Sequence, residues 1–192
     1  MIDSKTLITE CLSNNKFAQE KLYNYYSQKM FGVCMRFAKN RSEAEDILQE
    51  GFIKVFRNLA SFRNEGQLEA WIRRIIVNTA INSYKRKLPS IKDIDFDRFD
   101  NEFTYQENIV ESMSREELLR LVQELPNGYR RIFNLNAIEG YTHKEIGEML
   151  DISINTSKSQ LARARQALQK KIYRNSVDFF ATEDNLLAQL IV

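Results

Sequence analysis

Residues that break helices or bind metals are scarce in this sequence. Among its 192 residues there are two Pro, six Gly, two Cys and one His. So few helix breakers favour an all-α fold over a loop-rich or all-β one. One His and two Cys leave no cluster with the spacing of a metal site or of a Ser-His-Asp triad. We therefore expect no cofactor, no metal and no catalysis.

Long apolar runs are also missing. No segment approaches the roughly 20 apolar residues of a membrane span. The N-terminus, residues 1–5, lacks the basic start and apolar core of a signal peptide. Cys11 and Cys34 suit a reducing compartment as ordinary free thiols. These features predict a soluble, cytoplasmic protein without membrane insertion.

The net charge is only +2, but the charges are unevenly distributed. Residues 63–92 hold seven Lys or Arg against two Asp or Glu, and residues 154–174 hold six against none. Between them, residues 93–117 hold two against nine. A single charge run is most often a solvated helix face. Two basic blocks within helical sequence favour nucleic-acid phosphates as a partner.

The apolar spacing divides the chain into segments. Residues 17–87 and 113–174 carry apolar side chains at helical steps, whereas 88–112 is acidic and has no such period. We expect two small helical domains, 1–87 and 113–174, joined by a flexible linker over 88–112. A C-terminal tail over 175–192 follows. It is expected to pack on its own domain or to fray, with a partner-binding role as the alternative.

Residues 139–165 predict two helices joined by a tight turn, at about 143–150 and 154–172. Thr142 and Glu145 have the spacing of a capping box at the start of the first helix, and Ser114 and Glu117 have the same spacing at an earlier helix start. On the second helix one stripe is apolar and should face the core: Ile154, Leu161, Ala164, Leu168 and Ile172. The opposite side is polar and basic: Asn155, Thr156, Lys158, Ser159, Ala162, Arg163, Gln166 and Lys170. Short polar side chains and cations suit a DNA major groove, although a helical hairpin that binds protein has similar spacing.

A helix at about 44–60 has one apolar stripe, made of Ala44, Leu48, Phe52, Val55 and Leu59. Its opposite face carries Asp46, Gln49, Glu50, Ile53 and Arg57. An apolar Ile53 in acidic surroundings suggests a protein-docking surface. A solvated helix face explains the pattern equally well.

A further helix at about 67–87 should bury Leu68, Ile72, Ile75, Ile76 and Thr79. A neighbouring stripe holds Trp71, Arg74, Asn78, Asn82 and Lys85, which could bind phosphates and base edges. For Trp71 itself a place in the core is the favoured interpretation. The preceding loop, 62–67, contains Gly66 and polar side chains that could hold an extruded base.

Three stretches therefore occur in a fixed order. They are Ala44-Glu45-Asp46-Ile47-Leu48-Gln49-Glu50-Gly51-Phe52, then 62–86 around Trp71-Ile72-Arg73-Arg74, then 125–165 with Thr156-Ser157-Lys158-Ser159-Gln160-Leu161. Over about residues 17–174 their order and spacing resemble the extracytoplasmic-function (group 4) sigma factors of bacterial RNA polymerase. The resemblance implies a helical region two, a helix-turn-helix region four and no region three. It also implies core RNA polymerase and promoter DNA as partners, with an anti-sigma factor as a further candidate.

The resemblance implies three sets of binding residues. Core polymerase would be bound by Asp46, Gln49, Glu50 and Ile53. The −10 element would be bound by Arg63, Asn64, Gly66, Gln67, Arg74, Asn78, Asn82 and Lys85. The −35 element would be bound by Thr142, Asn155, Thr156, Lys158, Ser159, Ala162, Arg163 and Arg165. Leu68 stands where family members often have an aromatic residue, so base preference cannot be carried over through the loop.

The main rival is a stand-alone helix-turn-helix regulator, with residues 17–87 as an effector or dimerisation domain. Such a regulator should bind its operator tightly without polymerase. A sigma factor should bind promoter DNA strongly only together with core enzyme.

Overall fold

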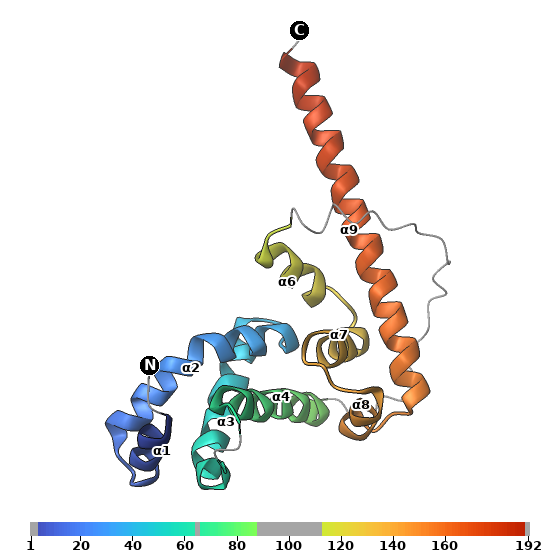
Figure 1. Ribbon diagram of the computed structural model, residues 1–192. Coiled ribbons are helices and arrows are strands. Elements are labelled where there is room, and N and C mark those ends of the chain that lie inside the picture. The colour runs from blue at the N-terminus through green and yellow to red at the C-terminus, as the bar shows by residue number, and fades with distance from the viewer. Residues whose placement is uncertain (1–3, 64–65, 88–112, 191–192) are drawn as a thin grey trace. The chain divides into compact units, whose positions relative to one another are not determined.

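All regular structure in the described residues is helical, which confirms the expected fold class (Figure 1). The computed structural model describes residues 4–63, 66–87 and 113–190. The chain divides into two compact units, 1–92 and 93–192. Within the described part of the chain, no helix is both long and apolar enough to span a membrane.

The first unit is built around three long helices. A short helix α1 (Ser4–Leu12) precedes α2 (Lys16–Phe37) and α3 (Arg41–Asn58). The 3₁₀ turn η1 (Leu59–Ser61) and α4 (Leu68–Lys87) complete the unit. Helices α2, α3 and α4 each pack against the other two. The sequence had suggested no separate helix for α1.

Asparagine side chains set the starts of α2 and α3. The Asn15 side chain accepts hydrogen bonds from the backbone N–H groups of Phe17 and Ala18, and that of Asn40 accepts one from Glu43. These caps satisfy backbone donors that a helix start leaves without partners. They also explain why α3 begins at Arg41, before the apolar pattern that predicted a start near residue 44.

The apolar stripes of α3 and α4 form much of the core. The predicted stripe is buried throughout: Ala44, Leu48, Phe52 and Val55 on α3, and Leu59 at the start of η1. On α4, Leu68, Ile72, Ile76 and Thr79 are buried, whereas Ile75 is half-buried. Burying one such aliphatic side chain fully is worth about 1.5–3 kcal/mol. A Cβ on Gly51 would collide with Cδ1 of Ile76, so a residue without a side chain lets the two helices approach closely.

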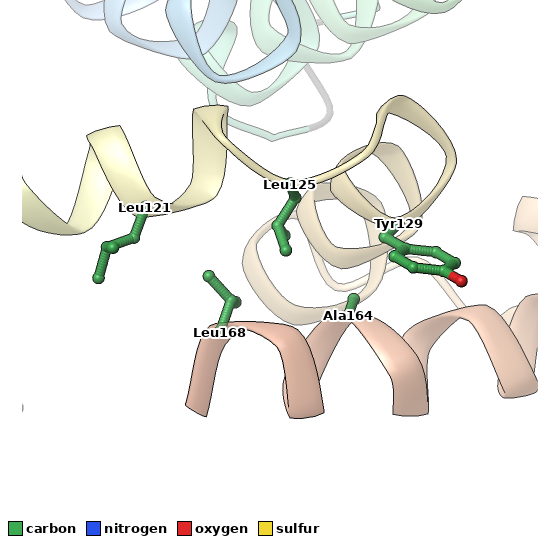
Figure 2. Packing of buried hydrophobic residues seen from close by; sticks show 5 residues of the cluster. All are labelled: Leu121, Leu125, Tyr129, Ala164 and Leu168. Carbon is green, nitrogen blue, oxygen red and sulfur yellow. The ribbon is translucent and has the colours of Figure 1, made fainter. Parts of the chain in front are cut away.

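The second unit places a helix-turn-helix on a small apolar core. Its elements are α6 (Arg115–Gln123), α7 (Asn127–Phe133), the π-helical turn η2 (Asn134–Ile138), α8 (His143–Leu150) and α9 (Ile154–Leu190). Figure 2 shows the core, where Leu121 and Leu125 lie opposite Leu168, and Tyr129 lies near Ala164. These contacts fix α9 against α6 and α7 through its first half.

Two expectations for α9 need correction. Its backbone continues to Leu190 rather than ending near residue 172. Ile154, expected in the core, is 45% exposed. The buried stripe includes Leu161, Ala164 and Leu168, as expected, and Ser157 joins them. At 100° per residue, Ile154 lies only about 20° from Leu161 around the helix, so its exposure follows from its place as the first residue of α9 and not from the side of the helix that it occupies.

Three parts of the sequence-based predictions lie outside the described residues. These are Asn64, the expected linker over 88–112, and the side chains of the expected tail over 175–192. The capping boxes at Ser114 and Thr142 are both present and confirm the predicted helix starts.

Candidate nucleic-acid and protein interfaces

A hollow of about 410 Å³ lies where the chain enters α4. It is lined by Ser61, Phe62, Arg63, Gly66, Gln67, Ala70, Trp71 and Arg74. Gly66 has φ of +123°, a backbone conformation that side chains other than glycine rarely adopt. Gln67 directly precedes α4, and its carbonyl accepts hydrogen bonds from the N–H groups of Ala70 and Trp71. The hollow therefore depends on a glycine turn followed at once by a helix.

Two aromatic rings form one wall of this hollow. The ring centroids of Phe62 and Trp71 are 5.4 Å apart, with an angle of 53° between the planes. Trp71 is half-buried, so the favoured prediction of a core residue is only partly right. Its ring packs on Phe62 and still faces the hollow. The sequence had not indicated that Ser61 and Ala70 would complete the lining.

Beyond the hollow, the polar stripe of α4 is exposed. Arg74, Asn78, Asn82 and Lys85 all present their side chains to solvent. At three- and four-residue steps they follow one face of the helix, adjoining the hollow at Arg74. The result is a continuous surface of an aromatic wall, two cations and two amides.

The outer face of α3 combines exposed acidic, amide and apolar groups. Asp46 and Gln49 are exposed, and Ile53 is 44% exposed, as expected for a surface residue. Tyr23 of α2 packs edge-to-face on Phe52, with centroids 4.8 Å apart, and remains 38% exposed. Tyr23 thus adds an aromatic group beside this face that the one-helix pattern could not reveal.

Glu50 differs from its neighbours on α3 because both its carboxylate oxygens are engaged within the protein. Oε1 lies 2.8 Å from Nζ of Lys54, and Oε2 lies 2.6 Å from Nη2 of Arg86. The hydrogen bond from Lys54 lowers the pKa of Glu50; partial burial opposes this shift, and Arg86 adds to it. Glu50 therefore links α3 to the end of α4.

In the second unit, side chains hold the helix-turn-helix in shape. Oε2 of Glu145 accepts hydrogen bonds from the backbone N–H and hydroxyl of Thr142, both at 2.8 Å. Asp151 ends α8 in the left-handed conformation, with φ of 58°. The Oγ of Ser153 then accepts the N–H of Thr156 at 3.0 Å, which caps the start of α9. Thr142 and Thr156 therefore both take part in turn geometry.

The predicted reading face of α9 is largely exposed. Asn155, Lys158, Ser159, Ala162 and Arg165 are exposed, whereas Thr156 and Arg163 are half-buried. The exposed set lies opposite the stripe that packs on α6 and α7. Arg163 sits at the edge of the reading face, and part of its guanidinium is buried against the protein. The centre of the face is therefore Ser159 and Ala162.

A basic helix on a helix-turn-helix, in a chain that also carries an aromatic hollow beside a polar stripe, is typical of a nucleic-acid-binding protein. Comparison with known proteins agrees. Residues 22–88 match Sigma-70 region 2, and residues 115–168 match Sigma-70 region 4.

Relatives match nearly the whole chain. The chain is 29% identical over 177 residues to the RNA polymerase sigma-H factor of Pseudomonas aeruginosa, covering 86% of this chain and 92% of that one. It is 29% identical over 179 residues to the ECF RNA polymerase sigma factor SigW of Bacillus subtilis, covering 88% and 96%. Among solved structures, the sigma factor RpoE in complex with the anti-sigma factor NepR from Bartonella quintana matches at 17% identity and a TM-score of 0.48, covering 81% and 96%.

The chain belongs to the sigma factors of bacterial RNA polymerase, in the extracytoplasmic-function group. It is a transcription initiation factor that binds core polymerase, recognises −35 and −10 promoter elements and aids promoter melting. The rival interpretation of a stand-alone regulator is therefore set aside. Membership of this family points to a role without catalysis.

Proposed function

We propose that the hollow before α4 captures a base extruded from the −10 element. Its volume of about 410 Å³ and its Phe62–Trp71 wall suit a flat aromatic ligand. Stacking on an aromatic side chain contributes about 1–3 kcal/mol per base, and this offsets part of the cost of unstacking. Gln67 supplies an amide for the base edge, and Arg63 supplies a cation for the flanking phosphate.

The stripe on α4 continues this single-strand site. Arg74 and Lys85 carry the charges that bind phosphates, and Asn78 and Asn82 carry amides that can bind base edges. Asn64, whose placement lies outside the described residues, and Gly66 complete the loop set. The exposure of the four α4 side chains in one line is the observation that supports this assignment most directly.

The outer face of α3 is our candidate for docking on core polymerase. Asp46, Gln49 and Ile53 are exposed together, and an apolar side chain within a polar rim is typical of protein interfaces. The family resemblance places Glu50 in the same set, but the Glu50 carboxylate is already bound to Lys54 and Arg86. An anti-sigma factor that covers this face would block the same contacts.

In the second unit, α9 is proposed to read the −35 element in the major groove. Asn155 can bind an adenine edge, Ala162 can approach a thymine methyl, and Lys158 and Arg165 can bind phosphates. Ser159 lies between them on the exposed face. Thr142, Thr156 and Arg163 belong to the same assignment, although the structure gives each of them partners or burial within the unit.

These assignments give a non-catalytic cytoplasmic initiation factor with domains at 1–87 and 113–174, a linker over 88–112 and a tail over 175–192. The test is transcription by purified core polymerase on a promoter library, together with binding of the free chain to the same DNA. We expect polymerase-dependent initiation and weak binding of the free chain. Tight operator binding without polymerase, and no initiation on any template, would contradict the proposal.

Single substitutions separate promoter melting from binding to core polymerase. Trp71→Ala should reduce promoter melting, measured by permanganate reactivity of the −10 region, with core affinity retained. Asp46→Ala should reduce core affinity. Tyr25→Ala is a matched control for loss of a partly exposed ring, because Tyr25 lies on α2 outside every proposed site and is 51% exposed.

A further inference from the structure

Glu50 connects two helices rather than facing outward. Its carboxylate binds Lys54 on its own helix at 2.8 Å and Arg86 on α4 at 2.6 Å. The Glu50 side chain is 34% exposed. Asp46 and Gln49, on the same side of α3, are exposed. A carboxylate with two cations already bound has less charge to offer a partner protein.

The same group of charges reaches α4 at a second point. Nζ of Lys54 also lies 3.3 Å from Oγ1 of Thr79, and Thr79 is buried. The hydroxyl of Thr79 donates to the carbonyl of Ile75 at 2.8 Å. Thr79 and Arg86 are seven residues, or about two turns, apart on α4 and so lie on the same side of it. We call Glu50, Lys54, Thr79 and Arg86 the α3–α4 clamp.

The clamp acts where the apolar core ends. Ala80 and Ile81 are buried, but no described side chain of α4 after Ile81 is buried. The following turn carries Asn82 and Lys85, which are the far end of the proposed −10 stripe. Helix ends fray when packing does not hold them. Ser83 and Tyr84 are half-buried there, and the bond from Arg86 to Glu50 joins the last turn of α4 to α3.

We propose that Glu50 is a positioning residue for the −10 surface and not a contact to polymerase. Through Arg86 it holds the last turn of α4 against α3, and so places Asn82 and Lys85 for the DNA strand. This inference rests on the proposed function of the α4 stripe. It reassigns Glu50, which the family resemblance had placed among the polymerase-binding residues.

Charge and exposure set the size of the effect. Arg86 is 61% exposed, and ion pairs at such sites contribute little individually. We therefore expect a change of roughly two- to fivefold in the local opening of the last turn, rather than unfolding of the unit. Because exposed charges are screened by salt, the effect should shrink at high ionic strength.

The first experiment measures hydrogen exchange of the backbone amides of residues 82–86 in the free full chain. Glu50→Gln should accelerate exchange there by roughly two- to fivefold. Glu45→Gln is the matched control, because it removes one charge from the same helix, where Glu45 pairs with Arg41 at 2.8 Å and not with α4. The control should leave exchange in residues 82–86 unchanged. Unchanged exchange in Glu50→Gln would overturn the proposal.

The second experiment separates DNA placement from polymerase binding. Glu50→Gln should keep core affinity within twofold of the unmodified chain and reduce permanganate reactivity of the −10 region by roughly two- to fivefold. A loss of core affinity as large as that of Asp46→Ala would overturn the inference. Faster amide exchange in residues 82–86 of Glu50→Gln, combined with unchanged promoter melting, would also overturn the inference. Asn78→Ala tests the α4 stripe independently of the clamp, because Asn78 is not part of the clamp. If promoter melting is unchanged in Asn78→Ala, the proposed function of the stripe fails on its own evidence.

A double-mutant cycle tests whether the two residues act on each other. If Glu50 acts through Arg86, Glu50→Gln combined with Arg86→Gln should accelerate exchange no more than the stronger single change. If the acceleration of exchange in the double variant equals the product of the two single accelerations, the two side chains act independently, and that result would also overturn the proposal.

Discussion

His143 and Ser157 join the two helices of the DNA-reading unit. Nδ1 of His143, in the first turn of α8, lies 2.9 Å from Oγ of Ser157 in the first turn of α9. Ser157 is fully buried, so its hydroxyl must find its partner within the protein. The bond therefore helps to set the angle at which α9 leaves the turn.

Ser157→Ala removes this bond and leaves the imidazole without that partner. We expect a loss of about 1–2 kcal/mol of unfolding free energy, the usual cost of a broken buried hydrogen bond. Thermal unfolding of the full chain measures it. Ser159→Ala serves as the stability control, because Ser159 is exposed and bonds only within its own helix, to the carbonyl of Thr156. Equal losses in both variants would show that the His143 contact is not important for stability.

Gly51→Ala should destabilise the first unit. The added Cβ collides with Cδ1 of Ile76, which is fully buried and so has little room to move away. Overpacking of this kind costs about 1–3 kcal/mol. Ile76→Val removes Cδ1, so the double variant should recover part of the loss although Ile76→Val alone costs about 0.5–1.5 kcal/mol. Additive losses in chemical denaturation would contradict this account.

Periodicity was sufficient for the fold because the apolar residues of this chain are spaced at helical steps. The buried stripe of α3 and the capping boxes at Ser114 and Thr142 could each be predicted from local sequence. The burial of Ser157 on α9 could not. Ser157 is a polar residue that bonds to His143 of another helix, and no single-helix pattern contains that information.

The same reasoning explains the outcome for the candidate sites. A stripe on one helix, such as Arg74, Asn78 and Asn82, follows from spacing, and its exposure agrees with the prediction. The pairing of Glu50 with Arg86 spans 36 residues and depends on how α3 and α4 pack. Spacing on α3 alone placed Glu50 on the outer face and could not show that its carboxylate was already bound.

Asp151→Gly should stabilise the second unit. Asp151 has φ of 58°, a left-handed conformation that costs a residue with a side chain about 1 kcal/mol and costs glycine little. The N–H of Asp151 bonds to the carbonyl of Gly147, and glycine keeps that bond. We expect a gain of about 0.5–1 kcal/mol in thermal unfolding. Asp151→Ala is the control that loses the side chain but keeps the strain, and an equal gain there would contradict the explanation.

Lys158→Ala should weaken promoter binding without changing sequence preference. Lys158 is exposed on the first turns of α9, beside the centre of the proposed reading face. Loss of one phosphate contact reduces the slope of log affinity against log salt by about 0.9. Titration of the complex with core polymerase at several salt concentrations measures the slope. Asn155→Ala should instead relax preference at one base pair, and a change of preference in Lys158→Ala would argue for a base contact.

Acid should weaken the α3–α4 clamp. The pKa of Glu50 in the folded protein lies below its ordinary value of 4.5, chiefly because Lys54 donates a hydrogen bond to the carboxylate. A lowered pKa means that the folded state favours the charged form, so the stabilisation is fully present above pH 4.5 and is lost as the pH falls through the folded value. The unfolding temperature of the unmodified chain should therefore exceed that of Glu50→Gln near neutral pH.

Below pH 4.5 this difference should narrow, because protonated glutamic acid and glutamine offer similar neutral groups to Lys54 and Arg86. Calorimetric scans between pH 7 and pH 3.5, roughly one unit below the ordinary pKa of glutamate, follow the change. Arg86→Gln removes one of the two cations that bind Glu50. The difference in unfolding temperature between Arg86→Gln and the variant that carries both Glu50→Gln and Arg86→Gln should therefore depend less on pH. A difference between the unmodified chain and Glu50→Gln that stays constant across the range would mean that the charge of Glu50 does not stabilise the contact between α3 and α4.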